Sequence, residues 1–454
     1  MAKPQKLNRI LIANRGEIAL RAIRVCRQLG LKTVAVYSAA DAGAAHVWAA
    51  DQAICIGSAA AQKSYLLGDA LVHVALQTEC NGVYPGYGFL AENADFARLC
   101  EQNGIKFIGP SAETIETMGN KSKARDVAVS LGVPVVPGSD GAYEAETEAR
   151  AVAEGIGFPI LLKARSGGGG RGMRIVRAMS DFQQAFVEAY REAEAAFGDG
   201  AIYLERFFDK VRHVEIQVFG DGAGASIEFD ERDCSVQRRH QKLIEESPSP
   251  SVNDRQRQAL KHAASLLTRG TNYEGAGTVE FILDVETGEF FFIEMNTRIQ
   301  VEHTVTEMRV GIDLIALQIA VAQGEGLPQA PKGRGHAIEF RVNAEDWEAG
   351  FVPSPGIITL WQVPQGSGIR LDTASKAGQR VQPYYDSMIA KLIIHGADRN
   401  DALARSSTAL AAFKVGGIKT TIGFHRMLIE HPDFAKNAIH TRWIEDVFSA
   451  KDEA

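Results

Sequence analysis

Hydrophobic and polar positions alternate most regularly along residues 278–307. Two runs rich in Val, Ile and Phe flank a turn at Thr287 and Gly288, a pattern that predicts a β-hairpin. Each run carries one acidic residue among apolar neighbours, Glu280 in the first and Glu294 in the second. A buried carboxylate needs a partner, and Mg²⁺ held between such carboxylates and nucleotide phosphates meets that need. The alternative is an exposed edge strand with ordinary charges.

Beyond the hairpin, polar residues recur at every second position, as Asn296, Arg298, Gln300 and Glu302. This spacing predicts an extended segment with one entirely polar face. Such a face is costly to bury unless it lines a site.

The N-terminal part alternates short apolar runs with helical periods. It predicts a helix over residues 17–29 and strands over 10–13, 33–37, 82–84 and 106–108. This βαβ rhythm indicates an open parallel sheet. The first turn, Asn14-Arg15-Gly16, lacks the GxGxxG spacing, so a dinucleotide site of the Rossmann type is disfavoured.

Residues 134–205 are predicted to form a small α+β unit inserted in a larger one. After a helix over 121–131, strands are expected at 158–163 and 173–176, followed by a helix in which Ser180 and Gln183 fit a capping box. A third region, rich in Gly and Pro, begins at Gly335 and has β character before a helical tail. The chain contains no Ala-Met-Lys-Met segment for covalent attachment of biotin.

Residues 166–172, SGGGGRG, follow directly after a predicted strand. Glycines let several backbone N–H groups turn toward one anion, so this run predicts a phosphate-binding loop in a lid rather than a flexible linker. It lacks the trailing Gly-Lys-Ser/Thr of a Walker loop. Lys121 and Lys163, before and within the unit, suit phosphate oxygens, although each alone is more readily a surface residue.

Cationic residues are concentrated in residues 231–242, ERDCSVQRRHQK. A nuclear-localisation patch, a solvated loop and an anion site are the three interpretations, and the acidity of the chain disfavours the first. Arg298 and, further on, Arg341 offer planar forks for an oxyanion, and Glu302 near Arg298 could remove a proton from a bound acid. The dispersed His213, His240 and His303 have no metal-ligand spacing, and Cys234 is expected to be an inert thiol.

Composition narrows the class of protein. The 454 residues are 45% hydrophobic and 23% charged, which is typical of a soluble protein with several packed units. A formal charge of −7 disfavours nucleic-acid binding. The five cysteines form no CxxC pair, which favours a reducing compartment. With no signal-peptide core and no apolar run long enough to cross a membrane, a cytoplasmic location is predicted.

Several long motifs together resemble biotin carboxylase, the ATP-grasp component of biotin-dependent carboxylases. They are ANRGEIALRAIR (13–24), PGYGFLAEN (85–93), SGGGGRGMR (166–174), RHVEIQV (212–218), ERDCSVQRRHQK (231–242), FIEMNTRIQVEHTVTE (292–307) and PYYDSMIAKLI (383–393). The resemblance is nearly colinear and runs from about residue 7 to residue 445. ATP-grasp membership alone does not settle function, and the segments at 231–242 and 294–307 are the specific ones.

The resemblance implies a multidomain protein of α/β and α+β class. An N-terminal parallel-sheet domain would span residues 1–115, and an ATP-grasp domain with a mobile glycine-rich lid (134–205) would span 116–333. A C-terminal mixed β/α domain would span 334–454. The implied reaction is ATP-dependent carboxylation of biotin by bicarbonate through carboxyphosphate, with the lid keeping water from the intermediate.

Site roles are likewise implied by the resemblance, position by position. The catalytic residues would be Glu302 as general base with Arg298, Lys242 and Arg341. ATP contacts would come from Lys121, Lys163, Gly169, Gly170, Glu205, Arg206, Phe207, Phe208, His213, His240, Glu280 and Glu294. Bicarbonate would be bound by Lys242, Arg298, Gln300, Val301 and Glu302. Biotin would be contacted by Tyr87, Arg341 and Asp386. The ligands of Mg²⁺, or of Mn²⁺, would be Glu280, Glu294 and Asn296.

The resemblance also implies partners. Biotin would arrive as a substrate on a separate carrier protein, a carboxyltransferase would use the product, and a homodimer is expected. The chain departs from the family pattern at Arg165-Ser166 before the glycines, at Arg206, and at Gln28 and Ser367, where dimeric relatives often have Glu and Phe. Two alternatives remain, a different ATP-grasp ligase and a non-enzymatic scaffold related to the family.

Overall fold

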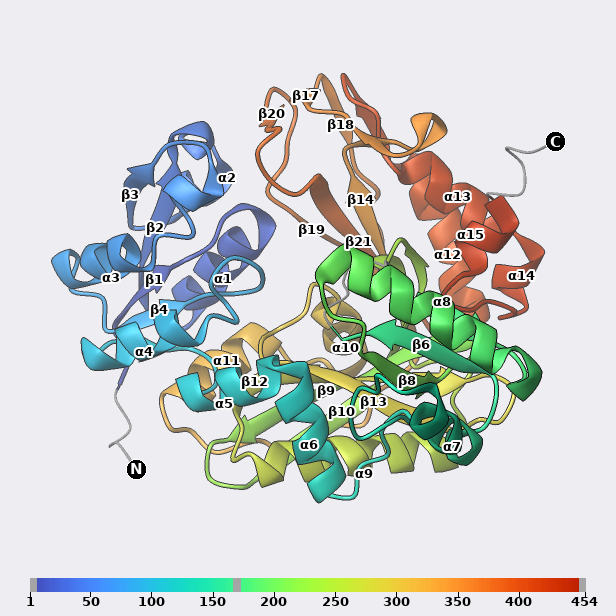
Figure 1. Ribbon diagram of the computed structural model, residues 1–454. Helices are drawn as coiled ribbons and strands as arrows, with labels where there is room; N and C mark the ends of the chain where they lie inside the picture. Colours follow the sequence, from blue (N-terminus) through green and yellow to red (C-terminus); the bar gives the residue numbers. More distant parts are fainter. Residues whose placement is uncertain (1–5, 166–172, 449–454) are drawn as a thin grey trace. The chain divides into compact units, whose positions relative to one another are not determined.

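A computed structural model describes residues 6–165 and 173–448 (Figure 1). Contacts divide the chain into a larger unit and a smaller unit. The larger unit comprises Met1–Val133, Arg212–Ile282 and Glu294–Ala454, and the smaller comprises Pro134–Val211 and Leu283–Ile293. No helix in the described part of the chain is both long and apolar enough to span a bilayer.

The N-terminal part of the larger unit is a five-stranded parallel sheet, which confirms the predicted βαβ arrangement. The strand order is β3 (Gln52–Gly57), β2 (Lys32–Ser38), β1 (Arg9–Ile12), β4 (Gly82–Tyr84) and β5 (Lys106–Phe107). Its helices are α1 (Gly16–Gln28), α2 (Ala45–Ala49), α3 (Gly68–Gln77) and α4 (Ala94–Gln102). Side chains of a strand alternate between faces, so Ile10 and Ile12 enter one core and Leu11 enters the other. A strand buried on both faces therefore reads as a continuous apolar run.

An eight-stranded sheet carries most of the predicted site. Its order is β13 (Phe290–Asn296), β12 (Glu274–Asp284), β9 (Val211–Asp221), β10 (Ser226–Arg238), β11 (Gln241–Ser247), β14 (His336–Asn343), β21 (Met388–Gly396) and β19 (Ile369–Thr373). The predicted hairpin is confirmed as β12 and β13, whose turn is closed by the Gly288 N–H donating to the Asp284 carbonyl at 2.9 Å. Helix α9 (Asp254–Gly270), begun by an Asn253–Gln256 capping box, packs against β10.

The rest of the larger unit is helical or built from short strand pairs. The remaining helices are α5 (Ala112–Gly119), α6 (Lys121–Ser130), α10 (His303–Val310), α11 (Leu314–Ala322), α12 (Arg399–Ala412), α13 (Ile422–Glu430), α14 (Pro432–Ala435) and α15 (Trp443–Phe448). The short pairs are β15 (Glu345–Asp346) with β16 (Val352–Pro353), β17 (Gly356–Ile357) with β20 (Arg380–Val381), and β18 (Leu360–Gln362) with β22 (Lys414–Gly416). The C-terminal region thus combines β structure with helices, as predicted.

The smaller unit has an antiparallel sheet of β7 (Met173–Val176), β6 (Ile160–Ala164) and β8 (Ile202–Arg206). Helices α7 (Glu146–Ile156) and α8 (Met179–Phe197) pack against it, and Figure 1 shows α8 running along this sheet. Ile160, Leu162 and Leu204 enter the common core.

Two local predictions are wrong. Helix α8 has Ala178 at its N-cap, and the Ser180 hydroxyl donates to Asp181, so Ser180 and Gln183 form no capping box. The segment after β13 is not extended either. The chain bends at Thr297 and Arg298 and turns at Val301 and Glu302 before α10 begins.

Candidate functional site

Buried charged side chains gather in the larger unit around the centre of the eight-stranded sheet. Lys242 of β11 is at the middle of this charge cluster. Its Nζ lies 2.7 Å from Glu215 Oε2, 2.6 Å from Glu302 Oε1 and 3.2 Å from Glu280 Oε1. Burial opposes the ammonium charge, but the three surrounding carboxylates hold the pKa of Lys242 well above its ordinary value. The group therefore stays a cation.

Glu302 is held between two cations. The turn before α10 places it at the N-cap of that helix, with its side chain fully buried. Its second oxygen lies 2.9 Å from Arg341 Nη2. Although burial alone would raise the pKa of Glu302, Lys242, Arg341 and Arg232 hold it well below the ordinary value. The carboxylate is thus ionised at neutral pH and able to accept a proton.

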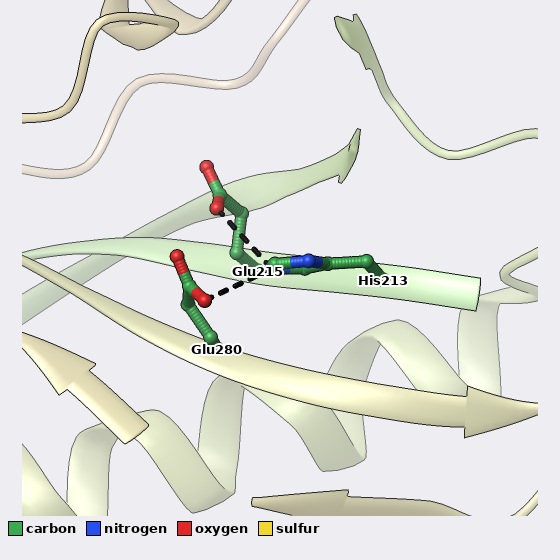
Figure 2. A group of neighbouring side chains, drawn as sticks. All are labelled: His213, Glu215 and Glu280. Carbon is green, nitrogen blue, oxygen red and sulfur yellow. Dashed lines mark ion pairs between the residues drawn. The ribbon is translucent and has the colours of Figure 1, made fainter. Parts of the chain in front are cut away.

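Glu280 of β12 receives polar contacts from several elements. The amide nitrogens of Asn296 and Gln300 lie 2.9 and 2.8 Å from Glu280 Oε1. Figure 2 shows the imidazole of His213 beside Glu215 and Glu280, with Nε2 3.1 Å from Glu280 Oε2. Burial lowers the pKa of His213, but these two carboxylates together raise it above its ordinary value. The polar residues predicted from the spacing of 296–302 thus do contact this site, but the backbone that carries them is bent rather than extended.

Glu215 and Arg232 also belong to the charge cluster, although neither was predicted as a site residue from the sequence. Arg232 Nε donates to Glu215 Oε1 at 2.5 Å, and both side chains are fully buried. Arg232 also donates to Gln217 at 2.7 Å and to Thr278 at 3.2 Å. The signal was present, because His213, Glu215 and Gln217 follow at every second position of a strand and so share one face.

The predicted metal ligands, Glu280, Glu294 and Asn296, come from adjacent strands and are all oxygen donors, which fits a hard cation such as Mg²⁺. Asn296 contacts Glu280, whereas Glu294 Oε2 is paired with Lys121 Nζ at 2.9 Å. Within residues 6–165 and 173–448, His213 with Glu215 and Glu280 also forms a potential metal-ligand group. Lys242 already neutralises that group, and its mixed nitrogen and oxygen donors suit Mg²⁺ less well.

A second potential metal-ligand group consists of Glu215, Cys234 and Glu302. Cys234 Sγ lies 3.8 Å from Glu302 Oε1. Burial raises the pKa of the Cys234 thiol well above its ordinary value, so the thiolate that would bind a metal is disfavoured.

Arg298 is held by Glu92, which was not among the predicted site residues. Its Nε donates to Glu92 Oε2 at 2.8 Å, while the other oxygen of Glu92 accepts from the Thr297 N–H at 3.1 Å. Arg298 Nη2 also donates to Asn296 Oδ1 at 3.1 Å. Glu92 belongs to the PGYGFLAEN segment, whose only predicted site residue was Tyr87.

Arg341 connects Glu302 to further buried acids. Its Nε donates to Glu245 Oε1 at 2.5 Å, and Glu245 lies directly opposite Glu339 across β11 and β14. Burial raises the pKa of Glu245 to about 7 and that of Glu339 to about 8. Because both side chains are fully buried, these facing carboxylates favour retention of a proton.

Two of the predicted biotin contacts, Tyr87 and Asp386, make their hydrogen bonds away from the charge cluster around Lys242. Tyr87 donates its hydroxyl to Glu17, and burial raises the pKa of Tyr87 well above its ordinary value. Asp386 is exposed and accepts from the Met388 N–H at 2.8 Å.

His240, a predicted ATP contact, is exposed in the turn between β10 and β11, with φ of 65°.

The remaining predicted ATP contacts lie in the smaller unit. Lys163 and Glu205 form an ion pair on one face of its sheet, and Phe208 stacks on Phe291 with ring centroids 5.2 Å apart. Arg206 donates to the Ile156 carbonyl at 3.3 Å, and the Phe207 N–H donates to the Pro159 carbonyl at 2.9 Å.

The predicted phosphate-binding glycines, Gly169 and Gly170, lie outside the described residues.

Three family models match in succession. They are the biotin carboxylase N-terminal domain over residues 6–115, the ATP-binding domain of the carbamoyl-phosphate synthase L chain over 120–330, and the biotin carboxylase C-terminal domain over 339–446. The arrangement of a parallel-sheet domain, an ATP-grasp domain and a C-terminal domain agrees with the predicted fold class.

Similar curated proteins include biotin carboxylase of Nostoc sp., 47% identical over 445 residues that cover 97% of this chain and 99% of that protein. Biotin carboxylase 1 of Bacillus subtilis is 49% identical over 97% of this chain and 98% of its own. The α subunit of methylcrotonoyl-CoA carboxylase of Glycine max is 46% identical over 97% of this chain, which corresponds to 61% of that larger protein.

Solved structures of biotin carboxylases are similar to this chain over nearly its whole length. A biotin carboxylase complex from Campylobacter jejuni has a TM-score of 0.88 at 47% identity, covering 97% of this chain and 99% of that one. The biotin carboxylase domain dimer of Hydrogenobacter thermophilus 2-oxoglutarate carboxylase, with MgADP, ADP and bicarbonate, has a TM-score of 0.86 at 45% identity. It covers 97% of this chain and 98% of that one.

Proposed function

Because this chain belongs to the biotin carboxylase family, we propose that it carboxylates biotin on a carrier protein, using ATP and bicarbonate. The observation that carries the proposal is the Glu302 carboxylate, fully buried and held 2.6 Å from Lys242 and 2.9 Å from Arg341. A base beside two cations is suited to bind a small oxyanion and then remove its proton.

Bicarbonate binds among Lys242, Arg298, Gln300, the Val301 backbone and Glu302. The two cations that now contact Glu302 shift part of their interaction to the incoming anion. Since Lys242 and Arg341 are what lower the pKa of Glu302, this shift raises its proton affinity at the moment when the proton is transferred. Glu302 then takes the bicarbonate proton.

The deprotonated oxygen attacks the γ-phosphorus of ATP, so a P–O bond forms to the carbonate as the bond to ADP breaks. The product, carboxyphosphate, separates into CO₂ and phosphate, and phosphate accepts the ureido N–H proton of biotin. The nitrogen then bonds to the CO₂ carbon. Arg341 stabilises the negative charge on the ureido oxygen, and Tyr87 and Asp386 contact the biotin.

Glu280, Glu294 and Asn296 would hold Mg²⁺, which when bound would neutralise phosphate oxygens. We assign nucleotide contacts to Lys121, His213, His240, Glu280 and Glu294. We assign further nucleotide contacts to Lys163, Glu205, Arg206, Phe207 and Phe208, and to the glycine run.

A carboxyltransferase and a biotin carrier are the proposed partners, because several relatives are subunits or domains of larger carboxylases. We also propose a homodimer, by analogy with the domain dimer of the Hydrogenobacter protein. A cytoplasmic location is supported by the five cysteines, all of which are unpaired.

ATP hydrolysis by the purified chain, with Mg²⁺ and bicarbonate and with or without free biotin, tests the function. Hydrolysis that rises with biotin, requires bicarbonate and is abolished by Glu302→Gln is expected. Glu286→Gln, an exposed acid in the turn of the β12–β13 hairpin, is the matched control and retains activity. Hydrolysis independent of both biotin and bicarbonate would indicate a different ATP-grasp ligase.

A further inference from the structure

Lys391 of β21 is a fully buried cation for which neither the motif analysis nor the proposed reaction provides a role. Its Nζ donates to the Val301 carbonyl at 2.9 Å and lies 3.2 Å from Glu17 Oε1. The same Glu17 accepts the Tyr87 hydroxyl. Lys391 therefore joins α1, the strand β21 and the turn that carries the general base.

Pairing within the sheet does not by itself explain this lysine. Lys391 lies directly opposite Arg341 on β14, which is an unfavourable like-charge pair, and directly opposite Asp372 on β19, which is a favourable opposite-charge pair. Burying an ammonium group adds a desolvation cost of several kcal/mol. A buried apolar residue at this position would avoid both costs.

The contact between Lys391 and the Val301 carbonyl is informative because the peptide bond of that carbonyl leads to Glu302. The Val301 carbonyl belongs to the planar peptide that ends in the N–H of Glu302, so holding the oxygen fixes the orientation of the whole unit. Glu302 is the N-cap of α10 with φ of −80° and ψ of 10°, and its side chain makes no capping hydrogen bond there. Its backbone is therefore not fixed by a side-chain cap of its own.

We propose that Lys391 is a positioning residue that holds the Val301–Glu302 peptide, and thereby aims Glu302 and the Val301 backbone at bicarbonate. This inference rests on the proposed function. The Glu17 carboxylate balances the Lys391 charge, and its contact with Tyr87 connects the peptide to the predicted biotin contact.

The charge needed for this role is maintained. Burial lowers the pKa of the Lys391 ammonium, but Glu17, Glu339 and Asp372 raise it above its ordinary value. Arg370 is a further facing charge and acts in the opposite sense.

The test compares the wild-type chain with Lys391→Met/Glu17→Gln and with Glu17→Gln alone. The double variant removes both buried charges together and deletes the donor to Val301, while the single variant keeps that donor. For the double variant we expect kcat/KM for bicarbonate to fall on the order of 10- to 100-fold, the effect of losing a charged hydrogen bond. Its KM for ATP and thermal midpoint should match those of Glu17→Gln, which should retain the wild-type KM for bicarbonate.

If the double variant keeps the wild-type kcat and the wild-type KM for bicarbonate, the positioning role of Lys391 is overturned, but the proposed function is not. A loss of activity that follows only the loss of folded protein would overturn that role as well. If the double variant does not fold, Lys391→Arg keeps the charge, displaces the donor and should raise the KM for bicarbonate without changing that for ATP. A wild-type chain without bicarbonate-dependent hydrolysis would overturn the proposed function, and this inference with it.

Discussion

The buried charge cluster of the larger unit and the solvated ion pairs of the smaller unit use charge in opposite ways. In the larger unit, Arg232 and Glu215 are each 0% exposed, and Lys242 is 12% exposed against a fully buried Glu302. In the smaller unit, Arg177 is 60% and Asp209 41% exposed. The first pairs are shielded from water on nearly every side, whereas the second are solvated.

Stability explains neither kind of pair well. Exposed pairs contribute little, and a buried pair is often no more stable than apolar residues of the same volume. Removing one partner of a buried pair is nevertheless severe, because an uncompensated charge remains. The buried charge cluster is therefore best explained by the reaction that it prepares, and it should be far more sensitive to substitution than the exposed pairs.

The largest effect is expected for Lys242→Met. It leaves Glu215, Glu280 and Glu302 close together without their shared cation, so the free energy of unfolding should fall by about 3–5 kcal/mol. Bicarbonate-dependent ATP hydrolysis should be lost as well. Urea unfolding and an ADP-release assay measure the two effects.

Lys419→Met is the matched control for Lys242→Met, since Lys419 is 61% exposed beside a 65% exposed Glu348. It should change neither quantity. Equal stability of the two variants would contradict the distinction between buried and exposed pairs.

A smaller but still large effect is expected for Arg232→Met. The substitution removes the donors to Glu215, Gln217 and Thr278 and leaves the buried Glu215 carboxylate facing Lys242 and His213. Unfolding free energy should fall by about 2–4 kcal/mol, and adding Glu215→Gln should recover part of the loss. A double-mutant cycle measured by urea unfolding gives the coupling, and additive losses would show that the pair does not act as a unit.

The Arg232–Glu215 pair also shows what the sequence could not reveal. The hairpin β12–β13, strand β7 and the parallel N-terminal sheet follow from local hydrophobic periods, and the prediction found them. The register of β9 against β10 does not follow from such periods. An irregularity between Glu228 and Glu231 sets Arg232 opposite Glu215, and no pattern in either strand specifies that shift.

The errors have a similar origin. The alternation from Asn296 to Glu302 looked like a strand, but Arg298 reaches Glu92, more than two hundred positions earlier, and the chain bends there. Local spacing identified the polar side chains that converge on Glu280 and Lys242. It could not describe the path of the backbone, because tertiary contacts decide that path.

A pH-dependent effect is expected for Glu339→Gln. Burial raises the pKa of Glu339 from its ordinary 4.5 to about 8. The protonated form is therefore favoured in the folded state, and its stabilising effect is fully present below pH 4.5 and lost as pH rises through about 8. Since glutamine resembles the protonated acid, the variant should gain stability relative to wild type steadily over that interval.

Urea unfolding of both proteins at several pH values measures this difference for Glu339→Gln. Glu348→Gln, an exposed acid, should show no such trend. A difference between the Glu339 variant and wild type that is constant with pH would mean that Glu339 is ionised throughout.

The smallest effect is expected at Arg165, where the family usually has a small residue. Its guanidinium makes two 2.9 Å hydrogen bonds to Asp199 in the smaller unit, yet its side chain is 50% exposed. Good geometry alone does not make such a pair stabilising, because water competes for both groups. Arg165→Ala should therefore leave the thermal midpoint unchanged, as should Arg177→Ala at another exposed pair of the smaller unit. A clear fall in the thermal midpoint of Arg165→Ala alone, measured by differential scanning calorimetry, would show that this pair is more stabilising than its exposure indicates. The contrast between buried and exposed pairs would then be weaker than we propose.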